Sequence, residues 1–157
     1  MKRLIFVFLF FTLLSSSGKE ETVKIYFLDE EIHLSNSAFL WQDNVMVPLK
    51  EFFNYWNIKV TFLTESKCFL LEDKNINLTL FPYSNKGLFG NKKITLPAKI
   101  IIRKNINFAP IITLRYFLPL VTFSWDSKNS TLTIIPPPAP SKQIISPETE
   151  LKLLPPD

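Results

Sequence analysis

Three residue types that often carry chemistry are scarce in this chain of 157 residues, which has one cysteine, one histidine and three glycines. With Cys68 alone, no intramolecular disulfide can form, so the core must be held by packing. With His33 as the single imidazole, a copper or zinc site of several converging ligands is not expected, and no cofactor is predicted. Three glycines also leave no glycine-rich loop to cradle a phosphate.

Cys68 and His33 each have an ordinary structural interpretation. Cys68 opens the strand-like stretch CFLLE and is expected to be a small strand residue. The alternative, a free thiol for pairing with another chain or for nucleophilic chemistry, has no second cysteine and no nearby histidine to support it. His33 lies between Ile32 and Leu34, so in a strand it points to the opposite face and is expected to be partly exposed.

The chain also has only a small excess of positive over negative charge. The formal net charge of +4 falls to +2 without Lys2 and Arg3, which lie in the first eighteen residues. This balance is too mild to predict a nucleic-acid partner. The acidic residues fall mostly in turns and at the termini, so no carboxylate pair is placed for acid–base catalysis. Only Glu51, on a predicted helix, is a candidate catalytic carboxylate.

Residues 1–18 have the layout of a secretory signal peptide: a basic start, an apolar run from Leu4 to Leu14, and then SSSG. At about 1.5 Å per residue, the run spans roughly half of a ~30 Å hydrocarbon core, so a permanent membrane span is the weaker interpretation. No cysteine follows the run to accept a lipid. The sequence therefore predicts export to an extracellular or cell-envelope location.

The rest of the chain divides into one domain, residues 19–135, and a Pro-rich tail, residues 136–157. The tail begins PPPAP and is expected to be an extended segment without a function of its own. The alternative is a spacer that holds the domain away from a surface or presents a peptide to a partner.

The domain contains an internal repeat. Residues 30–53 and 92–115 align without a gap at an offset of 62, so that Pro48 meets Pro110. After this stretch the offset becomes 63, which places Phe69 on Leu132. Two copies of one supersecondary unit are therefore expected, over about residues 23–73 and 74–135.

Each copy has a stretch with helical periodicity, which predicts a short helix of two to three turns. The first apolar stripe is formed by Leu49, Phe52, Phe53 and Trp56. Its spacing of i, i+3, i+4 and i+7 is helical, and Pro48 suits the first helical position. The matching positions in the second copy are Ile111, Leu114, Arg115 and Leu118. The second stripe is imperfect because Arg115 stands where the first has Phe53.

Short β-branched and aromatic runs surround the predicted helices, separated by polar clusters such as LDEE, TESK and DSKNS. The short gaps favour antiparallel pairing, because a parallel crossover needs a dozen or more residues. GLFGNKK, residues 87–93, is expected to be an ordinary connector between the copies, or else a mobile recognition loop. The predicted class is α+β, with short antiparallel strands curled around one or two short helices and two related sub-repeats.

Two stretches, VPLKEFF and FSWDSKNSTLTII, carry a family resemblance. With their surroundings, roughly residues 23–135, they resemble the copper amine oxidase N-terminal-like domain, also called a stalk domain, of many secreted bacterial proteins. The family pattern is a VPLR-like step into a short helix, then a strand with WD, a polar turn and an alternating strand. The resemblance implies an extracytoplasmic accessory module in which an antiparallel sheet curls around a helix. It implies neither copper nor a quinone cofactor, because those belong to a separate catalytic domain.

Two residues depart from the family pattern, which usually has glycine where the helix gives way to the next strand. This chain has Asn57 in the first copy and Pro119 in the second. Asn can adopt the left-handed conformation that glycine supplies at a helix end, and Pro cannot. The second helix is therefore expected to end differently.

Aromatic residues are plentiful and are the remaining candidates for ligand binding. If exposed, Trp41, Tyr83 and Trp125 could stack on sugar rings or peptide side chains, whereas Trp56 is expected in the core.

The leading hypothesis is a secreted, non-enzymatic module of the cell envelope with a structural or binding role. One alternative is a carbohydrate- or peptidoglycan-binding protein. The expected partner is cell-wall polysaccharide or another envelope protein. The last alternative, a small secreted hydrolase or inhibitor, would need Glu51 or another acid in a cleft.

Overall fold

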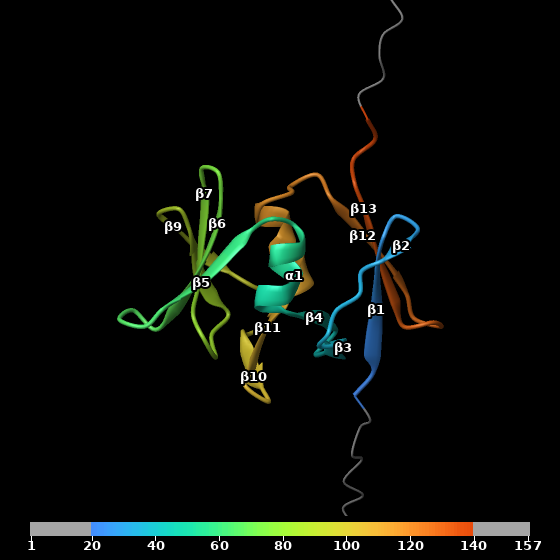
Figure 1. The fold of residues 1–157 in the computed structure, drawn as a ribbon, viewed down its shortest axis with the longest axis horizontal. Coiled ribbons are helices and arrows are strands. Elements are labelled where there is room, and N and C mark those ends of the chain that lie inside the picture. The colour runs from blue at the N-terminus through green and yellow to red at the C-terminus, as the bar shows by residue number, and fades with distance from the viewer. Residues whose placement is uncertain (1–19, 140–157) are drawn as a thin grey trace, which may run out of the picture.

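The computed structural model describes residues 20–139 and is drawn in Figure 1. The predicted signal peptide, residues 1–18, and most of the predicted Pro-rich tail lie outside the described residues. The described part consists of two β-sheets and two short helical segments, with far more strand than helix. The predicted α+β class therefore holds in outline.

The larger sheet has eight strands, in the order β10-β11-β4-β3-β1-β13-β12 with β2 paired to β1. Its strands are β1 (Thr22–Phe27), β2 (Glu30–Glu31), β3 (Ala38–Trp41), β4 (Asn44–Pro48), β10 (Ile101–Arg103), β11 (Ile106–Pro110), β12 (Thr122–Asp126) and β13 (Thr131–Ile135). The smaller sheet is an antiparallel meander of β5 (Lys59–Leu63), β6 (Cys68–Asp73), β7 (Ile76–Leu80), β8 (Lys86–Phe89) and β9 (Lys92–Thr95). In Figure 1 the meander lies to the left of the helical segments, and β1, β2, β12 and β13 lie to the right.

One strand pair in the larger sheet is parallel, against the predicted antiparallel arrangement. β1 runs alongside β13 with Ile25 opposite Leu132. The prediction rested on the short gaps between neighbouring strands. However, almost the whole domain separates β1 from β13, and this length easily supplies the crossover that a parallel pair needs.

Residues 87–93, expected to be a connector or a mobile loop, form most of a β-hairpin instead. β8 pairs with β9, with Phe89 opposite Lys92, and Gly90 in the turn has a φ of +55°. Gly87 is a strand residue rather than a loop residue. A Cβ at Gly87 would lie 2.7 Å from the carbonyl oxygen of Thr79 on β7, so the close approach of these strands requires glycine.

The first helix, α1 (Leu49–Tyr55), forms where the apolar stripe predicted it and buries Leu49, Phe52 and Phe53. The prediction that Pro48 is the first residue of α1 was wrong. Pro48 is the N-cap of α1 and the last residue of β4. Pro48 pairs with Phe108 of β11, which explains its extended conformation.

The second helical segment, η1 (Ile111–Tyr116), is a 3-10 helix. Side chains three residues apart align in a 3-10 helix, so Ile111, Leu114 and Phe117 are buried. Arg115, which matches Phe53 in the repeat, is exposed, and its guanidinium lies 5.2 Å from the centre of the Phe123 ring. The predicted stripe is therefore right at Ile111 and Leu114 and imperfect at Arg115 as expected, but Leu118 is exposed and Phe117 takes its place in the core.

The two helical segments end differently, as predicted. Asn57 adopts the left-handed conformation after α1, with a φ of +58°. At the end of η1, Phe117 has a φ of −100°, and the N–H of Leu118 donates to the carbonyl of Leu114 at 2.9 Å. Pro119 follows, so this end needs no left-handed residue.

One hydrophobic core joins both sheets and both helical segments. It includes Ile25 and Ile134 of the larger sheet, Leu78 of the meander, Phe53 of α1 and Leu114 of η1, each at most 2% exposed. Trp56 packs at the edge of this core, with its ring 5.1 Å from that of Phe27. The predicted placement of Trp56 in the core therefore holds, although the residue is only partly buried.

Candidate functional site

The three aromatic residues predicted to bind a ligand lie in three separate places. Trp41 is partly buried at the end of β3, where it packs against a cluster that includes Phe39 and Phe108. Tyr83 follows β7 and is 66% exposed. Trp125 is 39% exposed on the edge strand β12. Of the two clefts described next, one is lined by Trp125 and neither by Trp41 or Tyr83.

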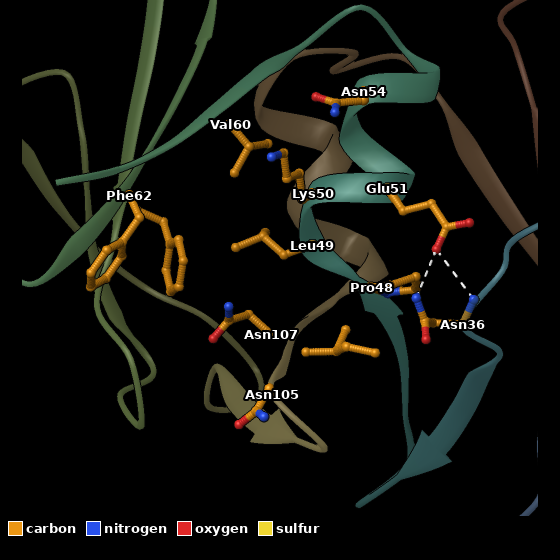
Figure 2. Close-up of a pocket in the computed structure, with 12 residues that line it drawn as sticks. Asn36, Pro48, Leu49, Lys50, Glu51, Asn54, Val60, Phe62, Asn105 and Asn107 are labelled. Atoms are coloured by element: carbon orange, nitrogen blue, oxygen red, sulfur yellow. Dashed lines mark hydrogen bonds between the residues drawn. The ribbon is translucent and has the colours of Figure 1, made fainter. Parts of the chain in front are cut away.

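An open cleft of about 520 Å³ lies beside the start of α1 and is called the α1 cleft. Three segments line most of it: residues 48–51 where β4 leads into α1, the β5–β6 wall, and residues 105–107 of the β10–β11 hairpin. Figure 2 shows their side chains converging from the helix, the meander and the hairpin. The cleft thus lies where parts of the chain far apart in sequence meet.

The polar side chains of the α1 cleft are mostly neutral amides, those of Asn36, Asn54, Asn105 and Asn107. Each offers both donors and an acceptor. Asn107 lies in the middle of the view in Figure 2, and its Oδ1 is buried without a hydrogen-bond partner among the described residues. An unpaired buried acceptor costs about 1–3 kcal/mol, a cost that a ligand hydroxyl or a water molecule would remove.

The apolar wall of the α1 cleft contains a pair of phenylalanines. Phe62 on β5 is 49% exposed, and its ring centre lies 5.0 Å from that of Phe69 on β6. Phe69 itself is buried and anchors the pair to the core. An exposed ring held by a buried one provides a rigid surface on which a flat apolar group can stack.

Glu51, the one carboxylate that lines the α1 cleft, is occupied by the fold. It accepts hydrogen bonds from the backbone N–H groups of Ser35 and Asn36, the latter at 3.2 Å, and from the side chain of Asn36 at 3.3 Å. Partial burial raises the pKa of Glu51, but these hydrogen bonds outweigh it, so the pKa is lowered from its ordinary value of 4.5. Glu51 therefore ties the segment before β3 to α1 as a carboxylate, and it is poorly suited to act as a general acid.

A second open cleft, of about 510 Å³, lies beside the start of η1 and is called the η1 cleft. It is lined by residues 110–112 where β11 leads into η1, by Phe123 and Trp125 of β12, and by residues 43–45 of the β3–β4 hairpin. Its lining is more apolar than that of the α1 cleft, and Asp43 is its one charged side chain. Trp125 is the exposed aromatic ring of this cleft.

Asp126, beside Trp125, holds a turn rather than a substrate. It accepts hydrogen bonds from the side chain of Asn129 at 2.7 Å and from the backbone N–H of Lys128 at 3.0 Å. The bond from the Asn129 side chain lowers the pKa of Asp126. Its role agrees with the prediction that the acidic residues serve in solvated turns.

The described residues do not fit a metal centre. Within residues 20–139, no three His, Cys, Asp or Glu side chains come together as metal ligands. His33 is exposed just after β2, with Ile32 beside it buried, so its predicted direction was right although it lies outside a strand. Cys68 is only 3% exposed on β6, in agreement with the predicted small strand residue.

Sequence reasoning missed Phe62, Asn105 and Asn107 as lining residues. Asparagines in turns have an ordinary explanation, since they tolerate left-handed backbone, and Asn105 does have a φ of +63°. One available signal was the repeat, since at an offset of 63 Phe62 matches Trp125, which the sequence did single out.

The fold and the clefts define a small β-rich module that presents open, mixed polar and aromatic surfaces. The chain belongs to the copper amine oxidase N-terminal domain family, whose sequence model matches residues 26–134, well over half of the chain. This match confirms the family predicted from VPLKEFF and FSWDSKNSTLTII. The matched domain is the N-terminal one of these oxidases and not their catalytic domain.

A search of curated proteins finds no match to the chain. In the part of the chain that the structure describes, no helix has the length and apolar character needed to cross a bilayer.

Proposed function

We propose that the chain is an exported, non-catalytic module of the cell envelope with a structural or binding role, without copper or amine oxidase activity. Membership of a family defined by an N-terminal accessory domain supports a non-catalytic role. The signal-peptide pattern of residues 1–18 supports export.

The observation that carries the non-catalytic part of this proposal is the state of Glu51. It is the one carboxylate lining the α1 cleft, and its oxygens are engaged by backbone N–H groups. The amides around it can donate and accept hydrogen bonds, but they do not titrate. Such a cleft is suited to hold a ligand rather than to transfer protons.

A second candidate function is carbohydrate or peptidoglycan binding through exposed aromatic residues. Among Trp41, Tyr83 and Trp125, the residue best placed for it is Trp125, because it lines the η1 cleft. The half-exposed ring of Phe62 in the α1 cleft supports the same candidate.

Fractionation of cells that produce the full chain tests the leading proposal. The wild-type chain is expected in the medium or the envelope, while Leu9→Arg, which places a charge in the apolar run, is expected to stay in the cytoplasm. A wild-type chain retained in the cytoplasm like this control would contradict export.

An activity assay tests the non-catalytic role. The exported chain, incubated with copper(II) and benzylamine, is expected to release no hydrogen peroxide. Sustained release would contradict the non-catalytic role.

A further inference from the structure

We propose that the α1 cleft and the η1 cleft are two corresponding but non-identical subsites for a neutral polysaccharide, built by the two related halves of the chain. This proposal rests on the carbohydrate-binding candidate above and deepens it. It makes the module bivalent, so that one chain engages two positions on a glycan.

The walls of the two clefts correspond through the sequence repeat. At the offset of 62, residues 48–50 of the α1 cleft match residues 110–112 of the η1 cleft. At the offset of 63, Phe62 matches Trp125 and Phe69 matches Leu132. The two half-exposed rings therefore occupy the same position in their respective clefts.

The pairing of β4 with β11 has an approximate local two-fold axis. Val47 lies opposite Ala109, its own counterpart at the offset of 62. On either side of this pair, Met46 faces Pro110 and Pro48 faces Phe108, which is the same pairing with the halves exchanged. The axis passes between the two clefts, since each cleft begins where one of these strands leads into its helical segment.

The hairpin turns correspond in backbone conformation as well. Gln42 and Asp43 join β3 to β4, both with positive φ, and Lys104 and Asn105 join β10 to β11 in the same way. Two-residue turns with positive φ at both positions are type I′ turns, which fix the direction of the hairpin. Asp43 and Asn105 thus lie at corresponding positions at the rims of the two clefts, the first with a carboxylate and the second with an amide.

Each cleft takes its turn from the opposite half of the chain. The α1 cleft uses residues 105–107 from the second half, and the η1 cleft uses residues 43–45 from the first. Neither cleft is complete within one half. This exchange follows from the β4–β11 pairing, which places each hairpin beside the helical segment of the other half.

The chemistry of the clefts favours a neutral sugar chain over other ligands. Amide side chains donate to and accept from hydroxyl groups, and an exposed ring stacks on the apolar face of a sugar. In the α1 cleft, the charges of Lys50 and Glu51 have opposite sign, and the η1 cleft carries only Asp43. An acidic polymer would meet only one basic side chain in the two clefts, Lys50, and an acidic one beside it, so we assign both clefts to an uncharged glycan.

The two subsites differ in what holds the ligand. At the positions of Lys50 and Asn107 in the α1 cleft, the η1 cleft has Ile112 and Val45. The α1 subsite therefore depends more on hydrogen bonds and the η1 subsite more on stacking against Trp125. An N-acetylated sugar, which carries an amide of its own, is expected to bind the α1 subsite better than its plain counterpart.

Calorimetric titration of the purified chain with chitohexaose and cellohexaose tests the proposal. Both are neutral β-linked oligosaccharides, and only chitohexaose is N-acetylated. Comparing their affinities therefore shows whether the clefts prefer an N-acetylated glycan or an unsubstituted one. We expect two sites per chain. Phe62→Ala and Trp125→Ala should each weaken one site at least about tenfold and leave the other, and the double variant should bind at neither. Tyr83→Ala, which removes an exposed ring outside both clefts, is the control and should retain both sites.

Two further measurements keep the result interpretable if a truncation disturbs the fold. Thermal unfolding of each variant verifies that it is folded. Phe62→Trp places in the α1 cleft the residue found at the equivalent position of the η1 cleft, so it should keep both sites and tighten the α1 site.

Three outcomes would overturn the proposal: no binding of either oligosaccharide, one folded single variant that abolishes both sites, or equal binding by an extended neutral peptide. A chain that reaches the envelope but binds no oligosaccharide would remove this inference and leave the proposed envelope role standing.

Discussion

The ring centres of Phe53 and Phe117 lie 6.2 Å apart, and this contact joins α1 to the end of η1 in the centre of the core. Phe53 is fully buried, and Phe117 is 5% exposed. Phe53 precedes the meander strands β5–β9 and Phe117 follows them, so this contact joins segments of the chain that lie far apart in the sequence.

Phe53→Ala should therefore be among the most destabilising single changes in the domain. Removing a fully buried phenylalanine leaves a cavity and is expected to lower the free energy of unfolding by about 3–5 kcal/mol. Urea unfolding followed by tryptophan fluorescence measures the loss. Phe62→Ala removes the same side chain from a half-exposed site and should cost less than about 1 kcal/mol. Similar losses for the two variants would contradict the described core.

Glu51 predicts a stability difference that depends on pH. Because its folded-state pKa is lowered, the carboxylate stabilises the fold above its ordinary pKa of 4.5, and this contribution is lost as the pH falls through the folded-state value. Glu51→Gln should cost about 1 kcal/mol or less at neutral pH, since Glu51 is only partly buried and the amide oxygen of Gln can still accept a hydrogen bond. The difference should shrink as the pH falls below 4.5 and vanish once Glu51 is protonated in the folded state. Glu65→Gln, in the exposed β5–β6 turn, removes the same charge and is the control. An effect of Glu51→Gln on stability that does not change with pH would rule out the carboxylate role.

Gly87 and Gly90 should respond differently to alanine. In Gly87→Ala the new Cβ meets the backbone of Thr79 at 2.7 Å, so β7 and β8 must separate, and a loss of about 2 kcal/mol or more is expected. In Gly90→Ala there is open space, and only the positive φ costs energy, about 1 kcal/mol. Thermal unfolding of both variants gives the order, and the reverse order would mean that β8 is not packed as described.

Cys68 offers a probe of global unfolding. Its side chain is buried on β6, so a thiol reagent should label it only when the sheet opens. In the native chain, labelling should be at least about a thousandfold slower than in denaturant, as expected for a domain of ordinary stability. Fast labelling of the folded chain would show that the meander opens locally.

Much of this fold follows from patterns in the sequence. The stripe of Leu49, Phe52 and Phe53 predicted α1, and Asn57 predicted its left-handed end. Alternating aromatic and β-branched runs predicted most of the strands. These features are local, because each depends on residues within one or two turns of chain.

Other features of the fold were not predicted, because they depend on contacts between residues far apart in the sequence or on packing. The parallel β1–β13 pair depends on where the chain returns after more than a hundred residues. The 3-10 form of η1 lets Phe117 rather than Arg115 face the core, a choice made by packing. The strand position of Gly87 does not follow from its residue type, because a close strand approach and a flexible loop both use glycine.

The candidate site was predicted only in part. Trp125 was identified by its residue type, but its cleft also needs the β3–β4 hairpin, which precedes it by some eighty residues. The asparagines of the α1 cleft gave no signal of their own because asparagine is common in turns. The place of Asn105 and Asn107 in this cleft depends on the β4–β11 pairing, which brings the β10–β11 hairpin beside α1.

The most direct measurement of the two-subsite account is an NMR titration of the isotope-labelled chain with chitohexaose. The account predicts shifts in two groups of signals, the side-chain amides of Asn105 and Asn107 in one cleft and the indole N–H of Trp125 in the other, with the signals of Tyr83 unmoved. Shifts confined to Tyr83 or Trp41, or none at all, would contradict it.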